Sequence, residues 1–531
     1  MKEMNRVVST GRFQRGYWPY LCIGLFVFLL YAKCLWFDFT YLDDNALILN
    51  NHGILSNPAN FFRLFKLGHF ISYTDAYYRP LVDASYMLDT ILGRGRYFMY
   101  HLTNIIIHIF ATALLYIFLI RLKVQRRFAF YFSLAFAVHP ALTQAVCWVP
   151  GRNDSMLGVF VLLSFIFFMN FSESRKLKDY LIHLFFFGLA LLTKETALVL
   201  PLLYFFFTPF PQRKIFLLSF GYGAVILVWF LLRQAALPGQ SGIMSFVVLK
   251  CFFKNLPALI QYIGKALLPF NLSVLPIIQD TSFIWGIMAI TLICVGLVIS
   301  KAIASRRVLF GGFCFFLFLA PAFFIPYPSN VTHFYEHRLY LPLVGLIIIL
   351  CEIAQRLKVK KEAFVVFSSL IIVIFSFAAF NRQDVFKDRM SFWQSAVKTS
   401  PHSPLVHRNL GAMYYLDGRL NEAELEYKEA LRINPYEPMA NNNLGLIFMQ
   451  KGQLDKAEQA FLRELSFNPD YDDANYNLGL LYHKLGRKEE ASRLWEKAVK
   501  INPNHKQAVE CLGKVRLRKS YRDGGYEEMA K

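Results

Sequence analysis

The chain has 531 residues, of which 56% are hydrophobic and 17% are aromatic. Long apolar runs, typical of membrane-spanning helices, dominate it up to about residue 385, and charged residues are dense beyond that point. Residues 386–531 carry 23 Lys and Arg against 20 Asp and Glu, so most of the net charge of +21 lies in short basic loops between the apolar runs. Basic loops beside spans follow the positive-inside rule, and a nucleic-acid partner is therefore not expected.

The apolar runs predict about eleven membrane spans. They cover roughly residues 17–37, 98–120, 128–147, 154–171, 180–194, 196–211, 214–232, 283–300, 308–326, 338–354 and 363–380. Placing the basic loops inside puts the N-terminus inside and, because the number of spans is odd, the C-terminus outside. No small-residue cleavage site follows the first run, so we expect it to be retained as a span. Residues 252–270 are expected to be interfacial or re-entrant.

Cysteine usage gives no sign of a disulfide framework or a zinc site. The eight cysteines form no CxxC pair, and Cys22, Cys294 and Cys314 lie inside apolar runs.

Beyond residue 400 the sequence repeats every 34 residues. The prolines and glycines of successive repeats share registers: Pro401, Pro435, Pro469 and Pro503, and Gly411, Gly445, Gly479 and Gly513. This period and its "NLG" and "NP" motifs predict a tetratricopeptide α-solenoid. The repeats cover 401–434, 435–468 and 469–502, with a capping helix over 503–520 and a tail over 521–531.

A partial repeat precedes the full ones. The stretch "FWQSAVKTSP" (392–401) matches "LWEKAVKINP" (494–503), and Trp393 lies three periods before Trp495. The second helix of an incomplete repeat is therefore predicted to join the last span to the solenoid without a flexible linker.

Asn409, Asn443 and Asn477 recur at one register on the first helix of each repeat. Two interpretations are open. Asn can simply be compatible with packing of the repeats, or the three amides can hydrogen-bond the backbone of a peptide bound on the concave surface of the array.

Polar and ionisable residues gather on the expected outer side of the membrane part. They are Asp43, Asp44, Arg79, His101, Arg152, Asp154, Lys194, Glu195, Glu336, His337 and Arg338. Ionisable groups at membrane depth are costly, so a functional role is the first hypothesis for them.

Structural explanations exist for several of these residues. The adjacent carboxylates Asp43 and Asp44 could cap the next helix. His101, Asn104 and His108 share a helical face and could hydrogen-bond between helices. Lys194 and Glu195 could pair with each other, and Arg79 could stack on Tyr77 or Tyr78.

The order of the motifs is more specific than any one of them. The outer "DD" (43–44), "YRPL" (78–81), "HLTNIIIH" (101–108), "HPALTQAV" with "GRND" (139–154), "TKET" (193–196), "HRLYLP" (337–342) and the tetratricopeptide tail follow one another. Together they resemble the TMTC-type protein O-mannosyltransferases of the GT-C superfamily of polytopic glycosyltransferases. The sequence departs from this family in two ways. Its repeat array is shorter than those of the eukaryotic members, and residues 233–282 match the family only loosely.

The resemblance implies an all-α protein with a GT-C-like membrane domain over 1–385 and a tetratricopeptide domain over 386–520. It implies transfer of a sugar, mannose in that family, from a polyprenyl-phosphate donor to a Ser or Thr hydroxyl of a protein, by single displacement with inversion. No metal ion and no other cofactor is expected from this resemblance, and the lipid-linked sugar is the co-substrate. His101, Arg152, Asp154, Glu195, Glu336 and His337 would then be further active-site candidates, and the repeats would recruit the acceptor.

The residues support that chemistry independently. Transfer to a hydroxyl needs a base for the acceptor proton, and Asp43 or Asp44 can serve, because adjacent carboxylates in a partly dry site raise each other's pKa. The leaving phosphate needs cations. Arg338 and Arg79 are the first candidates, because the planar guanidinium matches phosphate oxygens, and Lys194 is the third.

Two alternatives to protein glycosylation are a transferase that acts on a lipid or glycan acceptor and a non-catalytic membrane scaffold that presents a tetratricopeptide receptor. The compact array and the absence of a retention signal at "GGYEEMAK" favour a bacterial plasma membrane with the tail periplasmic or extracellular. A eukaryotic protein would place the tail in the lumen of the endoplasmic reticulum.

Overall fold

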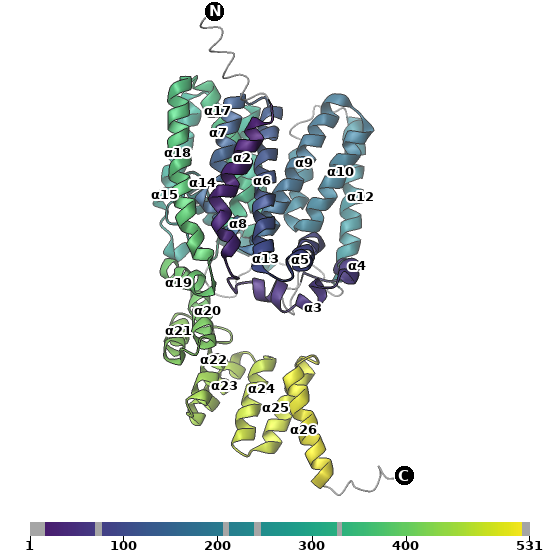
Figure 1. The fold of residues 1–531 in the computed structure, drawn as a ribbon, viewed down its shortest axis with the longest axis vertical. Helices are drawn as coiled ribbons and strands as arrows, with labels where there is room; N and C mark the ends of the chain where they lie inside the picture. Colours follow the sequence, from purple (N-terminus) through teal and green to yellow (C-terminus); the bar gives the residue numbers. More distant parts are fainter. Residues whose placement is uncertain (1–15, 70–76, 205–211, 238–245, 326–331, 523–531) are drawn as a thin grey trace, which may run out of the picture. The chain divides into compact units, whose positions relative to one another are not determined.

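The computed structural model describes residues 16–69, 77–204, 212–237, 246–325 and 332–522 (Figure 1). Within these ranges the regular elements are helices, with one isolated antiparallel bridge between Ile277 and His333, and the predicted all-α class is confirmed. The chain separates into two compact units, one up to Ser395 and one from Ala396, which we describe in turn.

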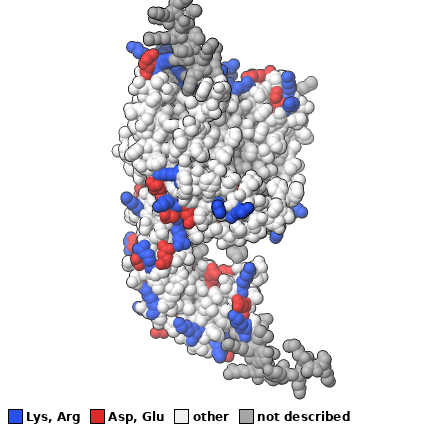
Figure 2. Space-filling model, in the orientation of Figure 1, with Lys and Arg blue, Asp and Glu red and all other residues white. Residues whose placement is uncertain are grey.

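The first unit contains the apolar helices. Their bounds are α2 (Trp18–Tyr31) with η1 (Ala32–Trp36), α5 (Pro80–Gly93), α6 (Tyr97–Arg121), α7 (Arg126–Ala137), α8 (Thr143–Cys147), α9 (Arg152–Ser174), α10 (Leu177–Thr193), α11 (Leu200–Tyr204), α12 (Gln212–Ala236), α13 (Phe246–Asn255), α14 (Ala258–Leu267), α15 (Ile284–Ile299), α16 (Arg306–Phe323), α17 (Tyr340–Arg356) and α18 (Lys361–Arg382). On the face seen in Figure 2, a broad band without charged residues covers these helices.

In the described ranges, seven helices are long and apolar enough to cross a membrane. They are Trp18–Trp36, Tyr97–Arg121, Val149–Ser174, Leu218–Ala236, Arg306–Phe323, Glu336–Arg356 and Lys361–Phe386. The bent pair Arg126–Ala137 and Pro140–Cys147, with an angle of 48°, adds an eighth if it is one span. The predicted count of eleven is not confirmed, because helices such as α10, with 17 residues, and α15, with 16, are short for a span.

Short helices complete the first unit. They are η2 (Asn45–Leu49), α3 (His52–Leu55), η3 (Pro58–Asn60) and α4 (Phe61–Leu64), followed further along the chain by η4 (Pro140–Leu142), η5 (Val149–Gly151), η6 (Glu195–Val199), η8 (Ile278–Asp280), η9 (Glu336–Leu339) and η10 (Gln383–Phe386). The predicted interfacial stretch 252–270 contains parts of α13 and α14, which have 10 residues each and are too short to span a bilayer.

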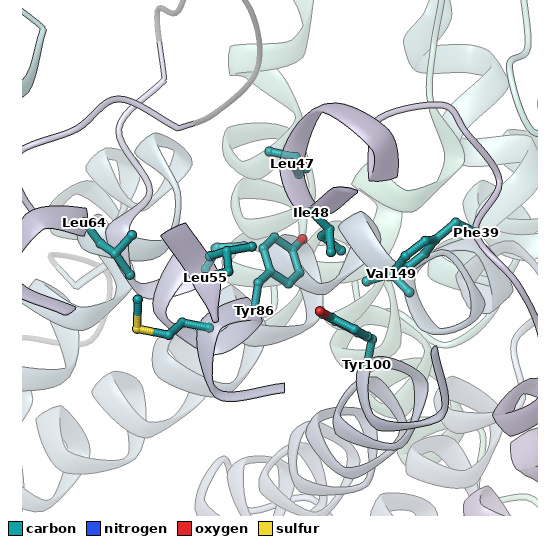
Figure 3. Close-up of a cluster of buried hydrophobic side chains, with 10 residues drawn as sticks. Phe39, Leu47, Ile48, Leu55, Leu64, Tyr86, Tyr100 and Val149 are labelled. Atoms are coloured by element: carbon teal, nitrogen blue, oxygen red, sulfur yellow. The ribbon is translucent and has the colours of Figure 1, made fainter. Parts of the chain in front are cut away.

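A buried apolar cluster fixes the segment that follows the first span. Phe39, Leu47, Ile48, Leu55 and Leu64 of this segment pack with side chains of α5 and α6 and with Val149 (Figure 3). Burial of large apolar side chains is the main stabilising term in folding. It therefore anchors the backbone on both sides of Asp43 and Asp44.

Two glycines let α16 and α17 approach closely. A Cβ at Gly311 would lie 2.5 Å from the backbone oxygen of Gly345, a distance that no side chain tolerates. Small residues at such crossings are typical of helix pairs in membranes. This tight pair supports η9 and the wall of the candidate site described below.

The second unit has the predicted repeat structure. Helix pairs α20 (Pro404–Leu416) and α21 (Leu420–Ile433), α22 (Ala440–Gln450) and α23 (Leu454–Phe467), and α24 (Asp472–Lys484) and α25 (Lys488–Ile501) are followed by α26 (Lys506–Arg522). Gly418, Gly452 and Gly486 lie between the helices of each pair with φ of 75°, 73° and 82°, where glycine is favoured. Helix α19 (Arg389–Thr399) precedes the first pair.

Candidate active site

A cavity of about 560 Å³ lies among the helix ends of the first unit. Its polar lining is Asp43, Tyr77, Arg79, Trp148, Asn153, Asp154, Lys194, Glu195, Thr196, Tyr335, His337 and Arg338. Its apolar lining comes from α9, η6, α16 and α17 and includes Leu157, Val199, Phe318, Pro321 and Leu341. Seven of the eleven side chains predicted from the membrane part therefore meet at one cavity, although they lie on five separate stretches of sequence.

The two adjacent carboxylates have different environments. Asp43 lines the cavity, and burial raises its pKa to about 6, although the charges of His69 and Arg79 act in the opposite direction. Asp44 is fully buried and does not line the cavity. Its Oδ2 accepts bonds from the hydroxyl of Thr40 at 2.7 Å and from the amide of Thr40 at 3.2 Å.

Burial also raises the pKa of the Asp44 carboxyl, to about 7, while the Thr40 donors act to lower it. Asp44 precedes η2, but its side chain makes no capping bond to that helix. The helix-cap explanation therefore does not describe Asp44, whose side chain reaches back to Thr40.

Arg79 and Glu195 form one ion pair at the cavity. Nε and Nη2 of Arg79 lie 3.4 and 3.2 Å from Oε2 of Glu195, and the Tyr78 amide donates to Oε1 of Glu195 at 3.2 Å. The guanidinium also lies over the ring of Tyr77, 4.4 Å from its centroid. Arg79 thus combines the predicted stacking with a position on the cavity wall.

Lys194 pairs with a carboxylate far away in the sequence. Its Nζ donates to Oδ1 of Asp154 at 2.6 Å, so the alternative of a pair with the adjacent Glu195 is wrong. His337 Nε2 lies 4.0 Å from Oδ2 of Asp154, and its ring lies 5.3 Å from that of Trp148. These residues form a polar wall built by α9, the end of α10, and η9.

The adjacent residues of η9 face different surroundings. Arg338 lines the cavity and lies over the ring of Tyr335, 4.7 Å from its centroid. Glu336 is fully buried and accepts bonds from Lys265 Nζ and Arg382 Nη2, both at 2.6 Å. Glu336 does not line the cavity and instead ties η9 to α14 and α18.

Arg152 and His101 are buried outside the cavity. Arg152 pairs with Asp89 at 2.5 Å and donates to Asn104 Oδ1 at 2.7 Å and to the Tyr100 oxygen at 2.8 Å. The His101 ring packs edge-on against Phe37 at 6.3 Å.

The helix-to-helix explanation holds for the two other members of the His101 face. Asn104 Nδ2 donates to the carbonyl oxygens of Val146 and Trp148 at 3.1 and 3.2 Å. The nitrogens of His108 lie 2.7 Å from the Tyr340 hydroxyl and 2.9 Å from the Ala137 oxygen. This face of α6 therefore binds its neighbours together.

Replacing Arg152 by Met is expected to destabilise the fold by about 3–5 kcal/mol, because the fully buried carboxylate of Asp89 would lose its counter-charge. Thermal unfolding of the purified protein in detergent measures this. The double variant Arg152→Met with Asp89→Asn should recover part of the loss. Equal melting of the single variant and the unchanged protein would contradict the buried pair.

Sequence reasoning missed several cavity residues. Asn153 lies within "GRND", Trp148 lies between "HPALTQAV" and "GRND", and Tyr335 lies two residues before "HRLYLP". Their positions within or beside these motifs were the available signal. The apolar wall from Phe318, Pro321 and their neighbours gave none, because its residues are indistinguishable in sequence from other lipid-facing or core positions.

The three register-matched asparagines of the second unit have partners inside the array. Asn409 Nδ2 donates to the Leu405 oxygen at 3.0 Å. Asn477 Nδ2 donates to Asn442 Oδ1 at 3.0 Å, and Asn442 donates in turn to Asn443 at 3.2 Å. These bonds favour a packing role, and peptide binding by the three amides stays a prediction.

Comparisons with known proteins agree with the order of these features. Residues 86–235 match the dolichyl-phosphate-mannose-protein mannosyltransferase family, and residues 411–486 and 473–505 match tetratricopeptide repeats. The tail aligns with the solved first tetratricopeptide domain of Spaghetti (RPAP3) at 24% identity, over 22% of this chain and 94% of that one, with a TM-score of 0.21. A score this low carries no argument about the ligand of the tail.

Among curated relatives, the protein O-mannosyl-transferase F38B6.6 of Caenorhabditis elegans is 25% identical over 433 residues, covering 75% of this chain and 60% of that protein. Tmtc1 of Drosophila melanogaster is 31% identical over 179 residues, and TMTC2 of Homo sapiens is 30% identical over 149. The matches cover 21% and 18% of these two proteins, so the chain spans less than two thirds of the length of each of the three relatives. The chain is therefore similar to the TMTC-type protein O-mannosyl-transferases: it has several apolar helices of spanning length, a region over residues 86–235 that matches the dolichyl-phosphate-mannose-protein mannosyltransferase family, and tetratricopeptide repeats.

Proposed function

We propose that this protein transfers mannose from a polyprenyl-phosphate donor to a Ser or Thr hydroxyl of a protein acceptor on the outer side of the membrane. The observation that carries the proposal is the meeting of Asp43 with Arg79, Lys194 and Arg338 on one cavity. Transfer of a sugar from a phosphate to a hydroxyl requires a base for the acceptor proton and cations that stabilise the leaving phosphate. The names and family of the relatives support mannose and a protein acceptor.

In this reaction the acceptor oxygen attacks the anomeric carbon of the sugar, and the bond from that carbon to the phosphate oxygen breaks. The acceptor proton passes to the Asp43 carboxylate, and the polyprenyl phosphate leaves with the bonding electron pair. Attack opposite to the leaving group inverts the anomeric carbon. Arg338, Arg79 and Lys194 would stabilise the charge that develops on the phosphate.

The mixed lining of the cavity also fits an amphipathic donor. Polar residues from the stretch before α5, from α9 and from η9 form one part of the lining, and apolar residues of α16 and α17 form another. A polyprenyl-phosphate sugar has the same division between a charged, hydroxylated head and a hydrocarbon chain. A non-catalytic scaffold gives no reason for a cavity that collects these ionisable groups at a cost in stability.

Reconstitution of the full chain in lipid vesicles tests the proposal. Polyprenyl-phosphate mannose with a radiolabelled sugar would be supplied with a protein acceptor, and label on Ser or Thr would be measured by mass spectrometry and counting. The Asp43→Asn variant is the control. Label on a lipid or glycan would favour the alternative acceptor. The absence of both transfer and donor hydrolysis would reject the enzymatic function.

The pH dependence of turnover is expected to show that a buried carboxylate is the base. A general base must be deprotonated, so turnover should fall about tenfold for each pH unit below the pKa of the base. Burial raises the pKa of Asp43 to about 6 and that of Asp44 to about 7. An acidic limb in kcat for donor hydrolysis between about pH 6 and 7 supports one of these two buried carboxylates as the base, because an exposed Asp titrates near pH 4. A kcat that stays constant down to about pH 5 would contradict both assignments, and the Asp43→Asn and Asp44→Asn variants separate the two residues.

The tetratricopeptide array would recruit the acceptor in this proposal, since arrays of this type offer extended surfaces for peptides. The compact repeat array is our reason for proposing a bacterial plasma membrane, with the array on its periplasmic or extracellular side. The proposed side rests on the basic loops and on the odd number of spans predicted from the sequence.

Changing Asn409, Asn443 and Asn477 together to Ala separates the two roles of the asparagines. If the amides bind acceptor backbone, KM for a protein acceptor rises while hydrolysis of the donor by water is unchanged. The bonds within the array predict instead a lower melting temperature of the second unit. Both quantities are measured on the same full-length variant, and unfolding without an acceptor effect would end the peptide-backbone hypothesis.

A further inference from the structure

An aromatic side chain joins the two helices in each complete repeat. These aromatic residues are spaced 34 residues apart, at Tyr427 on α21, Phe461 on α23 and Trp495 on α25. Each ring packs beside a glycine of the preceding helix, so closely that an added Cβ would touch the ring; the glycines are Gly411, Gly445 and Gly479 in the same order. The Trp495 indole N–H also donates to the carbonyl oxygen of Tyr476, at 3.1 Å. The aromatic residue therefore holds the first helix of its own repeat.

Trp393 has the same register, one period before Tyr427. It lies on α19, whose sequence is that of the second helix of a repeat, but the preceding helix is α18, an apolar candidate span. The first helix of this repeat is thus missing. Trp393 is nevertheless 1% exposed, and its indole N–H donates to the carbonyl oxygen of Thr40 at 3.1 Å, the distance found for Trp495.

Further contacts join the same two stretches of chain within the first unit. The amide of Asp38 donates to the carbonyl oxygen of Lys387 at 2.8 Å. The Arg389 guanidinium lies over the Tyr41 ring, 5.3 Å from its centroid. The segment 38–44 therefore occupies the side of α19 that a first helix covers in a complete repeat.

This segment also carries the two carboxylates. Thr40, whose carbonyl accepts from Trp393, donates its own hydroxyl to Asp44 at 2.7 Å. Tyr41 has a φ of 58°, in the left-handed region that a residue other than glycine rarely adopts. Such a conformation persists only where the surroundings impose it, so the bonds on either side of Tyr41 matter to the shape of the segment.

We infer that segment 38–44 completes the incomplete repeat and that Trp393 is a positioning residue for the Asp43 and Asp44 carboxylates. The inference rests on the proposed function for its catalytic readout. Trp393 fixes the backbone at Thr40, Thr40 fixes Asp44, and Asp43 is thereby held at the cavity. A displacement of about 1 Å in a reacting group can cost on the order of 100-fold in rate.

Trp393→Phe and Trp495→Phe form a matched pair, because each removes an indole N–H from an equivalent position and keeps an aromatic ring. The full chain in vesicles is supplied with polyprenyl-phosphate mannose, and its hydrolysis by water is measured. Trp393→Phe should lower kcat about tenfold or more and leave KM for the donor unchanged. Trp495→Phe should leave both unchanged. Equal kcat for the two variants overturns the inference.

A second pair of variants tests the same path without touching α19. Thr40→Ser keeps the hydroxyl that donates to Asp44, and Thr40→Val removes it, so kcat should fall with Val and stay close to normal with Ser. Equal kcat values overturn the inference even if Trp393→Phe does not fold. Asp43→Asn separates a failure of the proposed function from a failure of this inference. Full activity of Asp43→Asn rejects Asp43 as the base. An inactive Asp43→Asn together with a fully active Trp393→Phe rejects only the positioning role of Trp393.

Discussion

Replacing Asp43 by Asn is expected to lower the rate of mannose transfer by about 10²- to 10⁴-fold, the usual contribution of a general base. Asparagine has nearly the same shape, but its amide cannot accept the acceptor proton. The carboxyl of Asp43 lines the cavity, and burial raises its pKa to about 6, close to the value that suits a base near neutral pH. Single-turnover transfer from bound donor measures the effect without a contribution from product release.

Asp44→Asn is the matched control for this prediction. Asp44 does not line the cavity, and an asparagine side-chain oxygen can still accept the Thr40 hydroxyl bond. We therefore expect a smaller loss than for Asp43→Asn, together with unchanged donor binding. Near-normal transfer in both variants would show that neither carboxylate is the base. A larger loss in Asp44→Asn would exchange their roles.

Arg338→Ala is expected to weaken donor binding by about 10- to 100-fold, the equivalent of the roughly 1.5–3 kcal/mol that a hydrogen bond to a charged group contributes. Arg338 reaches the cavity from η9, which the buried Glu336 ties to Lys265 and Arg382. Arg338→Lys should restore only part of the affinity, because an ammonium group cannot reproduce the bidentate contact of a guanidinium with phosphate oxygens.

Equilibrium binding of a fluorescent polyprenyl-phosphate sugar to the full chain in detergent measures this effect. Arg96, an exposed arginine outside the cavity, provides the control variant Arg96→Ala, which should bind the donor normally. If Arg338→Ala binds as tightly as the unchanged protein, Lys194 or Arg79 holds the phosphate instead. Because Glu336 pairs with two other cations, a pairing of Arg338 with Glu336 does not explain its position.

Some properties of this protein follow from its sequence alone, because they depend on local patterns. A run of apolar residues reports a buried or lipid-facing helix wherever it occurs, and the 34-residue period reports repeats of one helix pair. The number of membrane spans was less predictable, because hydropathy does not give the exact length of a helix and several apolar helices, such as α10, are short. The gathering of Asp43, Arg79, Lys194 and Arg338 was also predictable, as ionisable groups near a membrane rarely lack a purpose.

Only the tertiary structure decided which of the neighbouring residues reach the cavity. Asp43 and Asp44 are adjacent, yet one lines the cavity and the other turns back to Thr40. Lys194 pairs with Asp154, 40 residues away, instead of with Glu195 beside it.

Arg152 and Glu336 likewise satisfy buried partners outside the cavity. The direction of a side chain depends on the backbone conformation at its residue and on the elements packed against it. A charged side chain can therefore pair with a residue on any element packed against its own, however far apart the two residues are in the sequence. The sequence thus specified the residue types, and the packing of distant helices decided which of them meet at the cavity.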